Sequence, residues 1–563
     1  MLENIARAHE IAAILIRYGF GDLVRRMGLA GTLARAGRAL HWHVPDDHAG
    51  LDRPARMRRA LEELGPTFVK LGQVLATRID LFDPPWIAEF SRLQDETPTV
   101  PFDALRPQLR AVLGAEPEAV FPTIETTALA GGSLAQVHAA TLADGTAVVL
   151  KIRRPGIRPV VEADLQLLAR IAELAEATLP ELRRFRLREV VRQFTRSLML
   201  ELDFETECRH AERIAANFRD RPEIVVPRVH WTWCDETLNV QDRIAGIPGR
   251  HLDAVDAAGL DRRLLAARGA DAVLKMMLED GFFHADPHPG NVFYLPDNRI
   301  ALIDFGMVGR LSERRRTEIA LLLQGLASRD AAAVATTLLD WADAQEGPDV
   351  PATDAAALEA RVEAFIDTFH GIPLGELDLG ALLTDALAIL REERLPVPPD
   401  LVLTIKTFIT LEGLGRALDP TFDMAGTAMP FIALSLARRH RPAALVRRGR
   451  RTVAQLARLL DDLPADLDRV LRLARRGRLK VDIDVAPLDR FAERFDRAVS
   501  RLTVGIVVAA LIVGGSIVGA RDSVPGSIWP TLGLIAFVAS VLGGIWLVVS
   551  IVRSWRRERG DRR

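Results

Sequence analysis

The chain has 563 residues, 49% of them hydrophobic and 26% charged, which excludes global disorder and predicts roughly two to four domains. A formal net charge of −2 provides no bulk field for nucleic acid, so we expect no nucleic-acid partner. The only two cysteines, Cys208 and Cys234, exclude a disulfide scaffold and a cysteine-rich metal site, and they fit a reducing compartment.

Residues 1 to about 120 have the apolar spacing of helices. Residues 1–20 lack the basic start and the uninterrupted apolar stretch of a signal peptide. They predict an amphipathic helix that packs on the domain or lies on a membrane. The stretch 53–78 predicts two helices that are separated at Gly65 and Pro66.

From about residue 121 the pattern changes to strands. Residues 127–156 contain a glycine-rich turn, an alternating stretch, the turn "ADGT" and the apolar strand "AVVLKI". Helices are predicted over about 160–220, over 254–282 and again over 310–430. Residues 437–480 form an arginine-rich tract that either binds anionic headgroups or is a solvated helix face.

Two uncharged apolar runs, 502–520 and 527–552, stand near the end of the chain. Each is long enough to cross a bilayer core of roughly 30 Å. Arginines precede the first run and follow the second, which predicts a transmembrane hairpin with both outer ends on the cytoplasmic side. The alternative is a buried helical hairpin in a soluble core.

The residues that carry chemistry come in a fixed order. Lys151 ends the strand "AVVLK", where a kinase fold aims a lysine at nucleotide phosphates, and Glu207 lies in a helical stretch that can pair with it. Asp286 and Asn291, in "HADPHPGN", have the D-x4-N spacing of a kinase catalytic loop. Asp304 opens "DFG" 18 residues after Asp286. The set predicts that Asn291 and Asp304 bind metal and that Asp286 lies beside the reacting oxygen.

Each of these residues also has a plainer interpretation. Asp286 and Asn291 could belong to an ordinary turn, since Asp-Pro and Pro-Gly-Asn are common turn formers. Lys151 could be an exposed lysine at a strand end. His284 and His288 could bind a metal, but a structural role is favoured for both.

The stretches that carry a family resemblance are "LGPTFVKLGQVLATRIDLFDPPWIAEFSRLQDETP" (64–98), "AGGSLAQVH" (130–138), "VVLKIRRPGI" (148–157), "ELDFETECRHAER" (201–213) and 281–311. On these residues the chain resembles the UbiB/AarF family of atypical kinase-like proteins over roughly residues 1–430. The apolar pair at the end also resembles bacterial members. The resemblance implies a role in ubiquinone biosynthesis.

The resemblance also implies site residues outside the ordinary kinase set. Lys70, Gly72 and Gln73 match the family's K-x-G-Q signature, which would fold across the active site and disfavour peptide substrates. Glu201 and Asp203 match its E-x-D element, which would contact that signature. Without the resemblance, this stretch would be an amphipathic helix with a surface lysine.

The phosphate loop departs from the family pattern. The family has an alanine-rich loop of the A-A-A-S type, whereas this chain has Ala130, Gly131, Gly132 and Ser133. Glycines allow close approach of the backbone but loosen it, which could alter nucleotide preference.

We therefore expect an α+β, protein-kinase-like bilobal fold with a helical N-terminal extension and a C-terminal two-helix transmembrane hairpin. The expected domains are the extension (1–120), the N-lobe (121–245), the C-lobe (246–430), a basic helical linker (431–500), and the hairpin with a basic tail (501–563).

The expected function is that of a membrane-tethered, ATP- and Mg²⁺-dependent ATPase that supports isoprenoid-quinone biosynthesis. Its place would be a bacterial-type inner (cytoplasmic) membrane, with the kinase-like domain on the cytoplasmic side. Membrane lipids, quinone precursors and quinone-biosynthetic enzymes are the expected partners, and a homodimer is left open. A true protein or small-molecule kinase and a non-catalytic nucleotide-binding scaffold are the alternatives.

Overall fold

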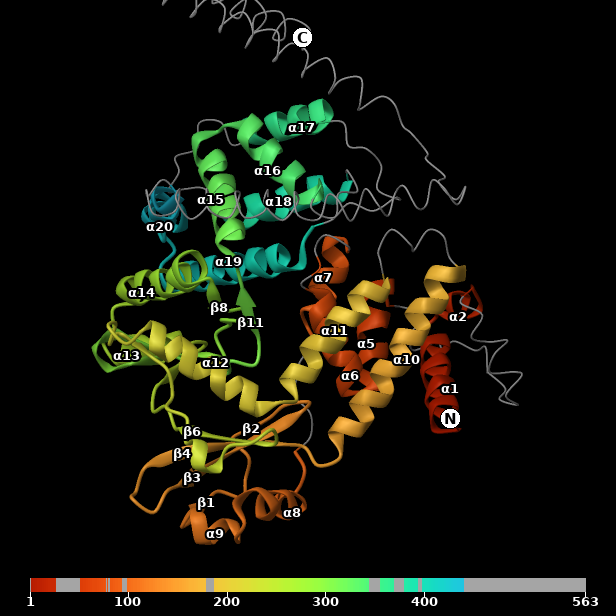
Figure 1. Cartoon of the computed structure of the whole chain (residues 1–563), viewed down its shortest axis with the longest axis vertical. Coiled ribbons are helices and arrows are strands. Elements are labelled where there is room, and N and C mark those ends of the chain that lie inside the picture. Colours follow the sequence, from red (N-terminus) through yellow and green to blue (C-terminus); the bar gives the residue numbers. More distant parts are fainter. Residues whose placement is uncertain are drawn as a thin grey trace, which may run out of the picture. The chain divides into compact units, whose positions relative to one another are not determined.

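The structure is a computed structural model (Figure 1). It describes residues 2–26, 51–76, 78, 82–93, 99–178, 187–343, 355–368, 379–392 and 397–439. The two apolar runs and most of the arginine-rich tract lie outside these residues. Among the described residues, no helix combines the length and apolar composition that a bilayer crossing requires.

The N-terminal region is helical, as predicted. Asp52 caps α5 by accepting a hydrogen bond from the Ala55 amide, and Gly65, at φ +98°, separates α5 from α6. The helices are α1 (Leu2–Arg17), α2 (Gly21–Arg26), α5 (Arg53–Leu64), α6 (Pro66–Ala76), α7 (Pro84–Phe90), α8 (Phe102–Leu113) and α9 (Pro117–Val120).

An antiparallel sheet follows in the order β1-β3-β4-β6, with β2 paired to β3 (Figure 1). The central pair β3 and β4 is joined by the predicted "ADGT" turn, where Gly145 has φ +88°. Val148, Leu150 and Ile152 alternate along β4 and share an apolar core with α8. The strands are β1 (Thr123–Ile124), β2 (Ala130–Gly131), β3 (Ala135–Thr141), β4 (Ala147–Arg153) and β6 (Leu238–Asp242).

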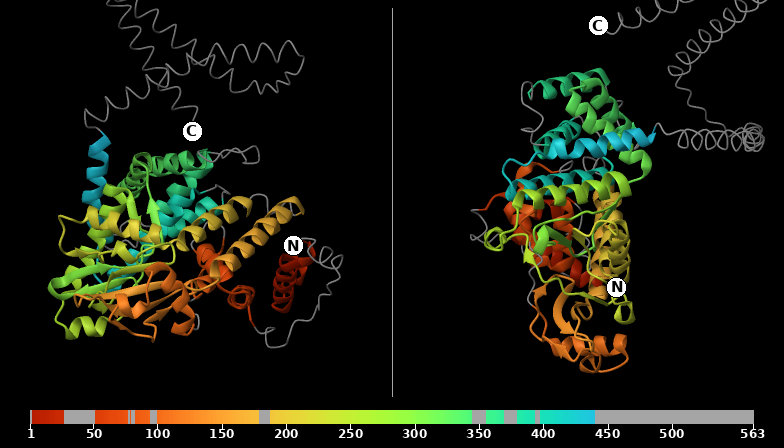
Figure 2. Two further views of the ribbon diagram at one scale, coloured as in Figure 1. Left: turned by 60° about the horizontal axis from the view of Figure 1, so that its bottom comes forward. Right: turned by 90° about the vertical axis from the view of Figure 1, so that its left-hand side faces the viewer.

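Three helices stand between β4 and β6: α10 (Ile157–Thr178), α11 (Leu187–Glu201) and α12 (Phe204–Asn217). Helices α10 and α11 share an apolar core with α1, α5, α6 and α7, to which Leu134 of the phosphate-loop region also belongs. Figure 2 shows α10 and α11 as long helices running out from the sheet. The N-terminal helices are thus packed onto the sheet-containing part of the chain.

The remaining described residues form a second, mainly helical part with its own core. This part also contains short strands: β5 (Ile224–Val225), β7 (Ile247–Pro248), β8 (Phe282–His284), β9 (Val292–Leu295), β10 (Arg299–Leu302) and β11 (Val308–Arg310). They pair as β5-β10-β9-β7 and β11-β8. Two 3₁₀ turns, Trp231–Trp233 and Pro296–Asn298, lie between strands.

The helices of this part are α13 (Leu252–Ala257), α14 (Arg262–Leu274), α15 (Glu313–Ser328), α16 (Ala331–Asp343), α17 (Ala355–Asp367), α18 (Leu379–Glu392), α19 (Pro399–Leu418) and α20 (Met424–Arg439). The stretch predicted to be helical, 254–282, is divided into two helices, and its helical part ends just before β8. Gly259, at φ +69°, follows the end of α13, α14 continues into a π-helical turn (Lys275–Asp280), and β8 has begun by Phe282.

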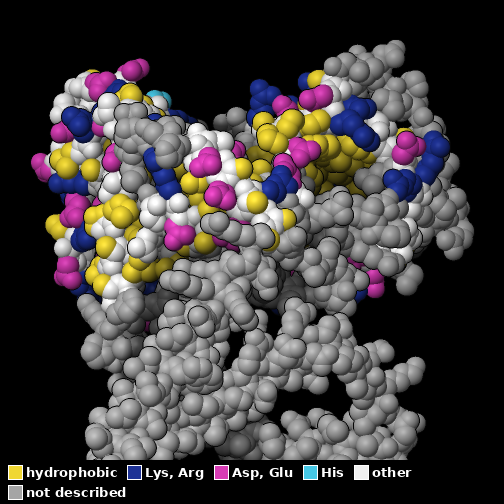
Figure 3. Space-filling model, turned by 90° about the horizontal axis from the view of Figure 1, so that it is seen from above, with side chains coloured by type: hydrophobic (Ala, Val, Ile, Leu, Met, Phe, Trp, Pro, Cys, Tyr) yellow, Lys and Arg dark blue, Asp and Glu magenta, His cyan; other side chains and the backbone are white. Residues whose placement is uncertain are grey.

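Seen from above in Figure 3, the described part of the chain carries acidic and basic side chains next to one another, and apolar side chains gather in patches between them. No field of a single sign covers the described part in this view, in keeping with the small net charge.

Candidate functional site

Lys151 and Glu207 form the centre of the site. The Lys151 Nζ lies 2.9 Å from both carboxylate oxygens of Glu207. Because neighbouring side chains on β4 face opposite sides, Lys151 points away from the apolar core of the sheet and toward α12. Glu207 is in the first turn of α12 and is 4% exposed. Burial raises the pKa of Glu207 to about 7, against the opposing effect of the Lys151 charge.

Asp304 completes this cluster from the second part of the chain. Its Oδ1 is 3.3 Å from the Lys151 Nζ and accepts a hydrogen bond from the Gly306 amide. Asp304 itself has φ +60°, a left-handed conformation that aspartate tolerates better than most residues. Burial alone would raise the pKa of Asp304, but Lys151 and the Gly306 amide hold it well below its usual value. Burial would lower the pKa of Lys151, but Asp304 and Glu207 raise it above its usual value.

The "HADPHPGN" loop begins where β8 ends, at His284. His284 is fully buried, its Nε2 bonds the carbonyl oxygen of Ile303 at 3.0 Å, and its Nδ1 accepts from the Asp286 amide. Burial lowers the pKa of His284. Both ring nitrogens therefore bind backbone, which links the loop to the residue that precedes Asp304.

Asp286 and Asn291 lie together in this loop. The Asn291 side-chain amide donates to the Asp286 carbonyl oxygen over 3.2 Å. That bond uses the amide nitrogen and leaves the amide oxygen as the group that can meet a cation. His288 is half exposed, with its Nε2 3.8 Å from Asp286 Oδ2.

Sequence reasoning missed one residue at this loop, Lys406 of α19. Its Nζ is 2.9 Å from Asp286 Oδ1. Burial would raise the pKa of Asp286, but Lys406 lowers it below its usual value. No motif could have found Lys406, because it is 120 residues from Asp286 in an Ala- and Leu-rich helical region.

The phosphate-loop residues lie at the edge of the sheet. Ala130 and Gly131 form β2, and the Gly132 amide donates to the Ala135 carbonyl oxygen at 2.8 Å. Arg154, just after β4, donates to the Gly132 carbonyl oxygen at 3.0 Å. The Ser133 hydroxyl is buried and has no hydrogen-bond partner among the described residues. An unpaired buried hydroxyl in this loop suits a ligand that brings its own acceptor oxygens.

The K-x-G-Q residues have two roles in the structure: Gly72 and Gln73 hold α6 in place, and Lys70 contacts an acid of the site. Gly72 lets α6 pack closely, since a Cβ there would lie 2.1 Å from Leu93 Cδ1, and Gln73 donates to the Leu93 carbonyl oxygen at 3.1 Å. Lys70 instead forms an ion pair with Glu201, with 2.5 Å between Nζ and Oε1. The Lys70 charge also contributes to lowering the pKa of Asp304.

In the E-x-D element, Glu201 pairs with Lys70 of the signature, whereas Asp203 has hydrogen bonds within its own helix. The Asp203 side chain caps α12, accepting from the amides of Glu205 and Thr206 and from the Thr206 hydroxyl. Its place in the structure thus explains how the helix that carries Glu207 begins.

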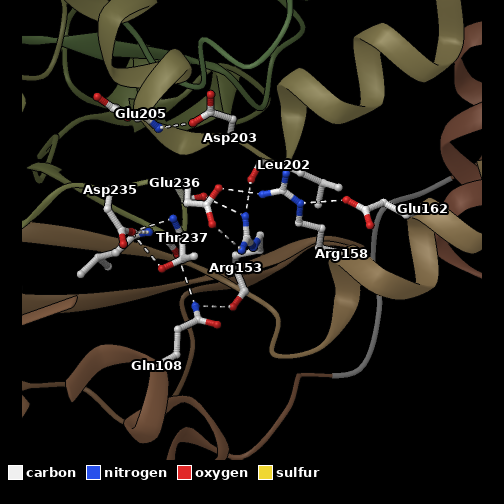
Figure 4. Close-up of polar contacts among 11 residues, drawn as sticks. Gln108, Arg153, Arg158, Glu162, Leu202, Asp203, Glu205, Asp235, Glu236 and Thr237 are labelled. Carbon is white, nitrogen blue, oxygen red and sulfur yellow. Dashed lines mark hydrogen bonds and ion pairs between the residues drawn. The ribbon is translucent and has the colours of Figure 1, made fainter. Parts of the chain in front are cut away.

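Arg153, at the end of β4, connects this strand to the E-x-D element and to Glu236 (Figure 4). Its guanidinium donates to the carbonyl oxygens of Leu202, at 2.8 Å, and Glu236, at 3.2 Å. Leu202 lies between the two acidic residues of the E-x-D element. The strand that supplies Lys151 therefore also holds the start of α12, and Arg158 of α10 joins the network by pairing with Glu236 at 2.7 Å.

The donor set fits a nucleotide phosphate with a hard divalent cation. Asp304 and Asn291 offer oxygens on short side chains, and Lys151 offers a point charge. No group of three or more His, Cys, Asp or Glu side chains with metal-binding geometry occurs within the described part of the chain. Two protein oxygens completed by phosphate oxygens and water would not form such a group.

The strand lysine, the helix glutamate and the two loop acids are the arrangement of a kinase-like fold. The model of the ABC1 atypical kinase-like domain matches residues 92–338, that of the UbiB helical domain matches 362–423, and that of the ABC1/UbiB kinase-like C-terminal domain matches 486–553. The last range includes both apolar runs.

Full-length relatives agree with these matches. "Probable protein kinase UbiB" of Pectobacterium carotovorum subsp. carotovorum is 33% identical, covering 99% of each chain, and that of Azotobacter vinelandii is 33% identical, covering 97% of this chain and 98% of its own. The chain therefore belongs to the UbiB/AarF family of atypical kinase-like proteins. A solved complex of Rv3197 with erythromycin from Mycobacterium tuberculosis is 20% identical and covers 62% of this chain and 92% of its own. The TM-score between the two structures is 0.42.

Proposed function

We propose that this chain is a Mg²⁺- and ATP-dependent atypical ATPase that acts at a membrane in support of isoprenoid-quinone biosynthesis. The observation that carries the nucleotide chemistry is the Glu207–Lys151–Asp304 cluster, in which one lysine bridges an acid from the helix and an acid from the "DFG" turn. Hydrolysis of a phosphoanhydride needs positioned charge more than covalent chemistry from the protein.

Each residue has a distinct part in this proposal. Lys151 meets the phosphates and is oriented by Glu207, while the loop of 130–133 lies along the phosphates. Asp304 and Asn291 are the residues that would hold Mg²⁺, which when bound neutralises charge on the phosphate oxygens. Asp286 positions the attacking water, and its low pKa keeps it ionised at neutral pH.

The attachment to a membrane rests on the sequence of 502–520 and 527–552 and on the kinship with UbiB proteins. Isoprenoid intermediates partition into bilayers, so an activity that supports their conversion belongs at the surface. The glycines in both runs suit close packing of two helices. The proposed site faces the cytoplasm at the inner membrane, and lipids and quinone-biosynthetic enzymes are the proposed partners.

The test is ATP hydrolysis by the purified full-length chain, with and without Mg²⁺ and with and without vesicles that contain anionic lipid. Asp304→Asn should abolish hydrolysis, while Asp253→Asn, on the exposed side of α13, is the matched control. Lipid-stimulated hydrolysis that only Asp304→Asn loses would support the proposal. Nucleotide binding without turnover would favour a scaffold.

A second candidate is phosphoryl transfer to a small acceptor. The Asp286 carboxylate, about a third exposed, favours it, because a hydroxyl acceptor needs an accessible base. α6 borders the site through the Lys70–Glu201 pair, which disfavours a peptide acceptor. Incubation with γ-labelled ATP and a membrane lipid extract separates the two activities: label in an organic-soluble product indicates transfer, and label in inorganic phosphate alone indicates hydrolysis.

A further inference from the structure

Helix α19 holds the "HADPHPGN" loop at two successive residues. Lys406 pairs with the Asp286 carboxylate at 2.9 Å, and the Thr407 hydroxyl donates to the Ala285 carbonyl oxygen at 3.3 Å. Lys406 belongs to the segment that matches the UbiB helical domain, whereas Asp286 belongs to the kinase-like domain match. The helical domain therefore contributes a charged side chain to the proposed site.

Lys406 stays accessible although its sequence neighbours on α19 are buried. Ile405, Thr407 and Phe408 are each 5% exposed or less. The Lys406 ammonium reaches the Asp286 carboxylate as an ion pair. Lys406 and Asp286 nevertheless remain 29% and 31% exposed, so a ligand can reach both.

The choice of lysine is itself informative in this chain. Only five of its 73 basic residues are lysines, so a permanent positive charge is nearly always supplied by arginine. Three of the four described lysines pair with acids of the site, and the fourth pairs with Asp280 elsewhere in the same part. These are Lys70 with Glu201, Lys151 with Glu207 and Asp304, Lys406 with Asp286, and Lys275 with Asp280.

Lysine differs from arginine in being a compact point charge on a flexible stem. When a phosphate changes position during a reaction, a lysine ammonium can keep contact with it more easily than the planar guanidinium of arginine can. The three lysines that pair with acids of the site are therefore suited to contact phosphate as well.

The loop itself lacks a permanent cation. Between Asp286 and Asn291 stand Pro287, His288, Pro289 and Gly290, of which only His288 can carry a positive charge. Phosphoryl chemistry places negative charge on the oxygens of the departing or transferred group, and a cation beside the base stabilises it. Lys406 is the residue that supplies this charge from outside the loop.

This step rests on the proposed nucleotide chemistry. We propose that Lys406 is the cation of the "HADPHPGN" loop: it orients the Asp286 carboxylate and contacts the terminal phosphate of the bound nucleoside triphosphate. Lys151 and Lys406 then approach the phosphates from two parts of the fold, and the helical domain becomes part of the binding site.

The test compares affinities for ATP and ADP, each with Mg²⁺, in the full-length chain. Lys406→Met should weaken ATP binding by about ten- to a hundredfold, as expected for a charge-assisted contact, and change ADP binding by less than about threefold. The matched control is Lys275→Met, which breaks a pair of similar length, 2.8 Å, with Asp280. It should leave the ratio of the two affinities unchanged.

A second variant tests the form of the charge. Lys406→Arg keeps the positive charge but replaces the compact ammonium with a planar fork, so it should lower the preference for ATP part of the way.

The outcomes separate this inference from the function on which it rests. A wild-type chain that binds no Mg-ATP overturns both. If the wild-type chain binds Mg-ATP and Lys406→Met keeps the wild-type ratio of ATP affinity to ADP affinity, only the role of Lys406 is overturned. An equal loss of ATP affinity in Lys275→Met overturns that role as well. If Lys406→Met fails to fold and so loses ADP binding as well, Lys406→Arg decides, and a wild-type ratio in that variant overturns the inference.

Discussion

The guanidinium of Arg153 donates to the carbonyl oxygen of Leu202 over 2.8 Å, and both groups are buried. Arg153 is two residues after Lys151 on β4, and Leu202 stands between Glu201 and Asp203. One strand thus places Lys151 and, through Arg153, the segment that carries Glu201 and Asp203.

Replacing the buried Arg153 with methionine should lower the free energy of unfolding. The variant leaves the buried carbonyl oxygen of Leu202 without this donor, which costs about 1–3 kcal/mol of the free energy of unfolding. Urea denaturation measures this loss. Arg158→Met breaks a more exposed contact to Glu236 and should cost less than about 1 kcal/mol. Equal losses in the two variants would contradict the role assigned to Arg153.

Glu207 should give stability an unusual pH dependence. Its pKa is about 7 in the folded state, above the usual value of 4.5, so the folded chain binds this proton more tightly than the unfolded chain. The stability from this group is therefore present below about pH 4.5 and is lost as pH rises to about 7. Glu207→Gln removes this dependence. Relative to wild type, the variant should gain stability between pH 5 and pH 8, as measured by denaturant unfolding at each pH. A constant difference across that range would contradict the raised pKa.

Gly132→Ala should change nucleotide preference without disturbing the fold. A Cβ at this position would lie 3.4 Å from the Ala135 carbonyl oxygen, an ordinary contact. The alanine also restricts the backbone of the phosphate loop. This restriction raises or lowers the free energy of the nucleotide-bound conformation by roughly 1 kcal/mol. We expect the ratio of ATP to ADP affinity to change several-fold in a binding titration. Unchanged affinities for both nucleotides would show that the glycines of this loop do not set preference.

Gly72→Ala should loosen α6 from its neighbours. The added methyl would lie 2.1 Å from Leu93 Cδ1 and 2.9 Å from Leu61 Cδ1, so side chains must shift, at a cost of about 1–3 kcal/mol. We expect a lower midpoint of thermal unfolding. Gly413→Ala, in α19 with nothing within 4 Å of the added Cβ, is the control and should not lower the midpoint. A midpoint unchanged by Gly72→Ala would mean that α6 packs less tightly than described.

The motifs predicted the centre of the site well because their chemistry depends on local geometry. The strand alternation of 147–153 and the "DFG" turn each fix one side chain, and the structure brings Lys151, Glu207 and Asp304 together. Lys406 could not be predicted, since its contact depends on how α19 packs against a loop 120 residues away. Asp203 was assigned by resemblance to a tertiary contact, whereas its position before Phe204 makes it a helix cap.

The two bonds of His284 have a mechanical consequence. Because one imidazole is bonded to the backbone of Asp286 and of Ile303, Asp286 and the neighbouring Asp304 share a common support. We therefore expect the distance between these two acids to vary less than the distance from either of them to Lys151, which comes from β4 and has no bond to this imidazole.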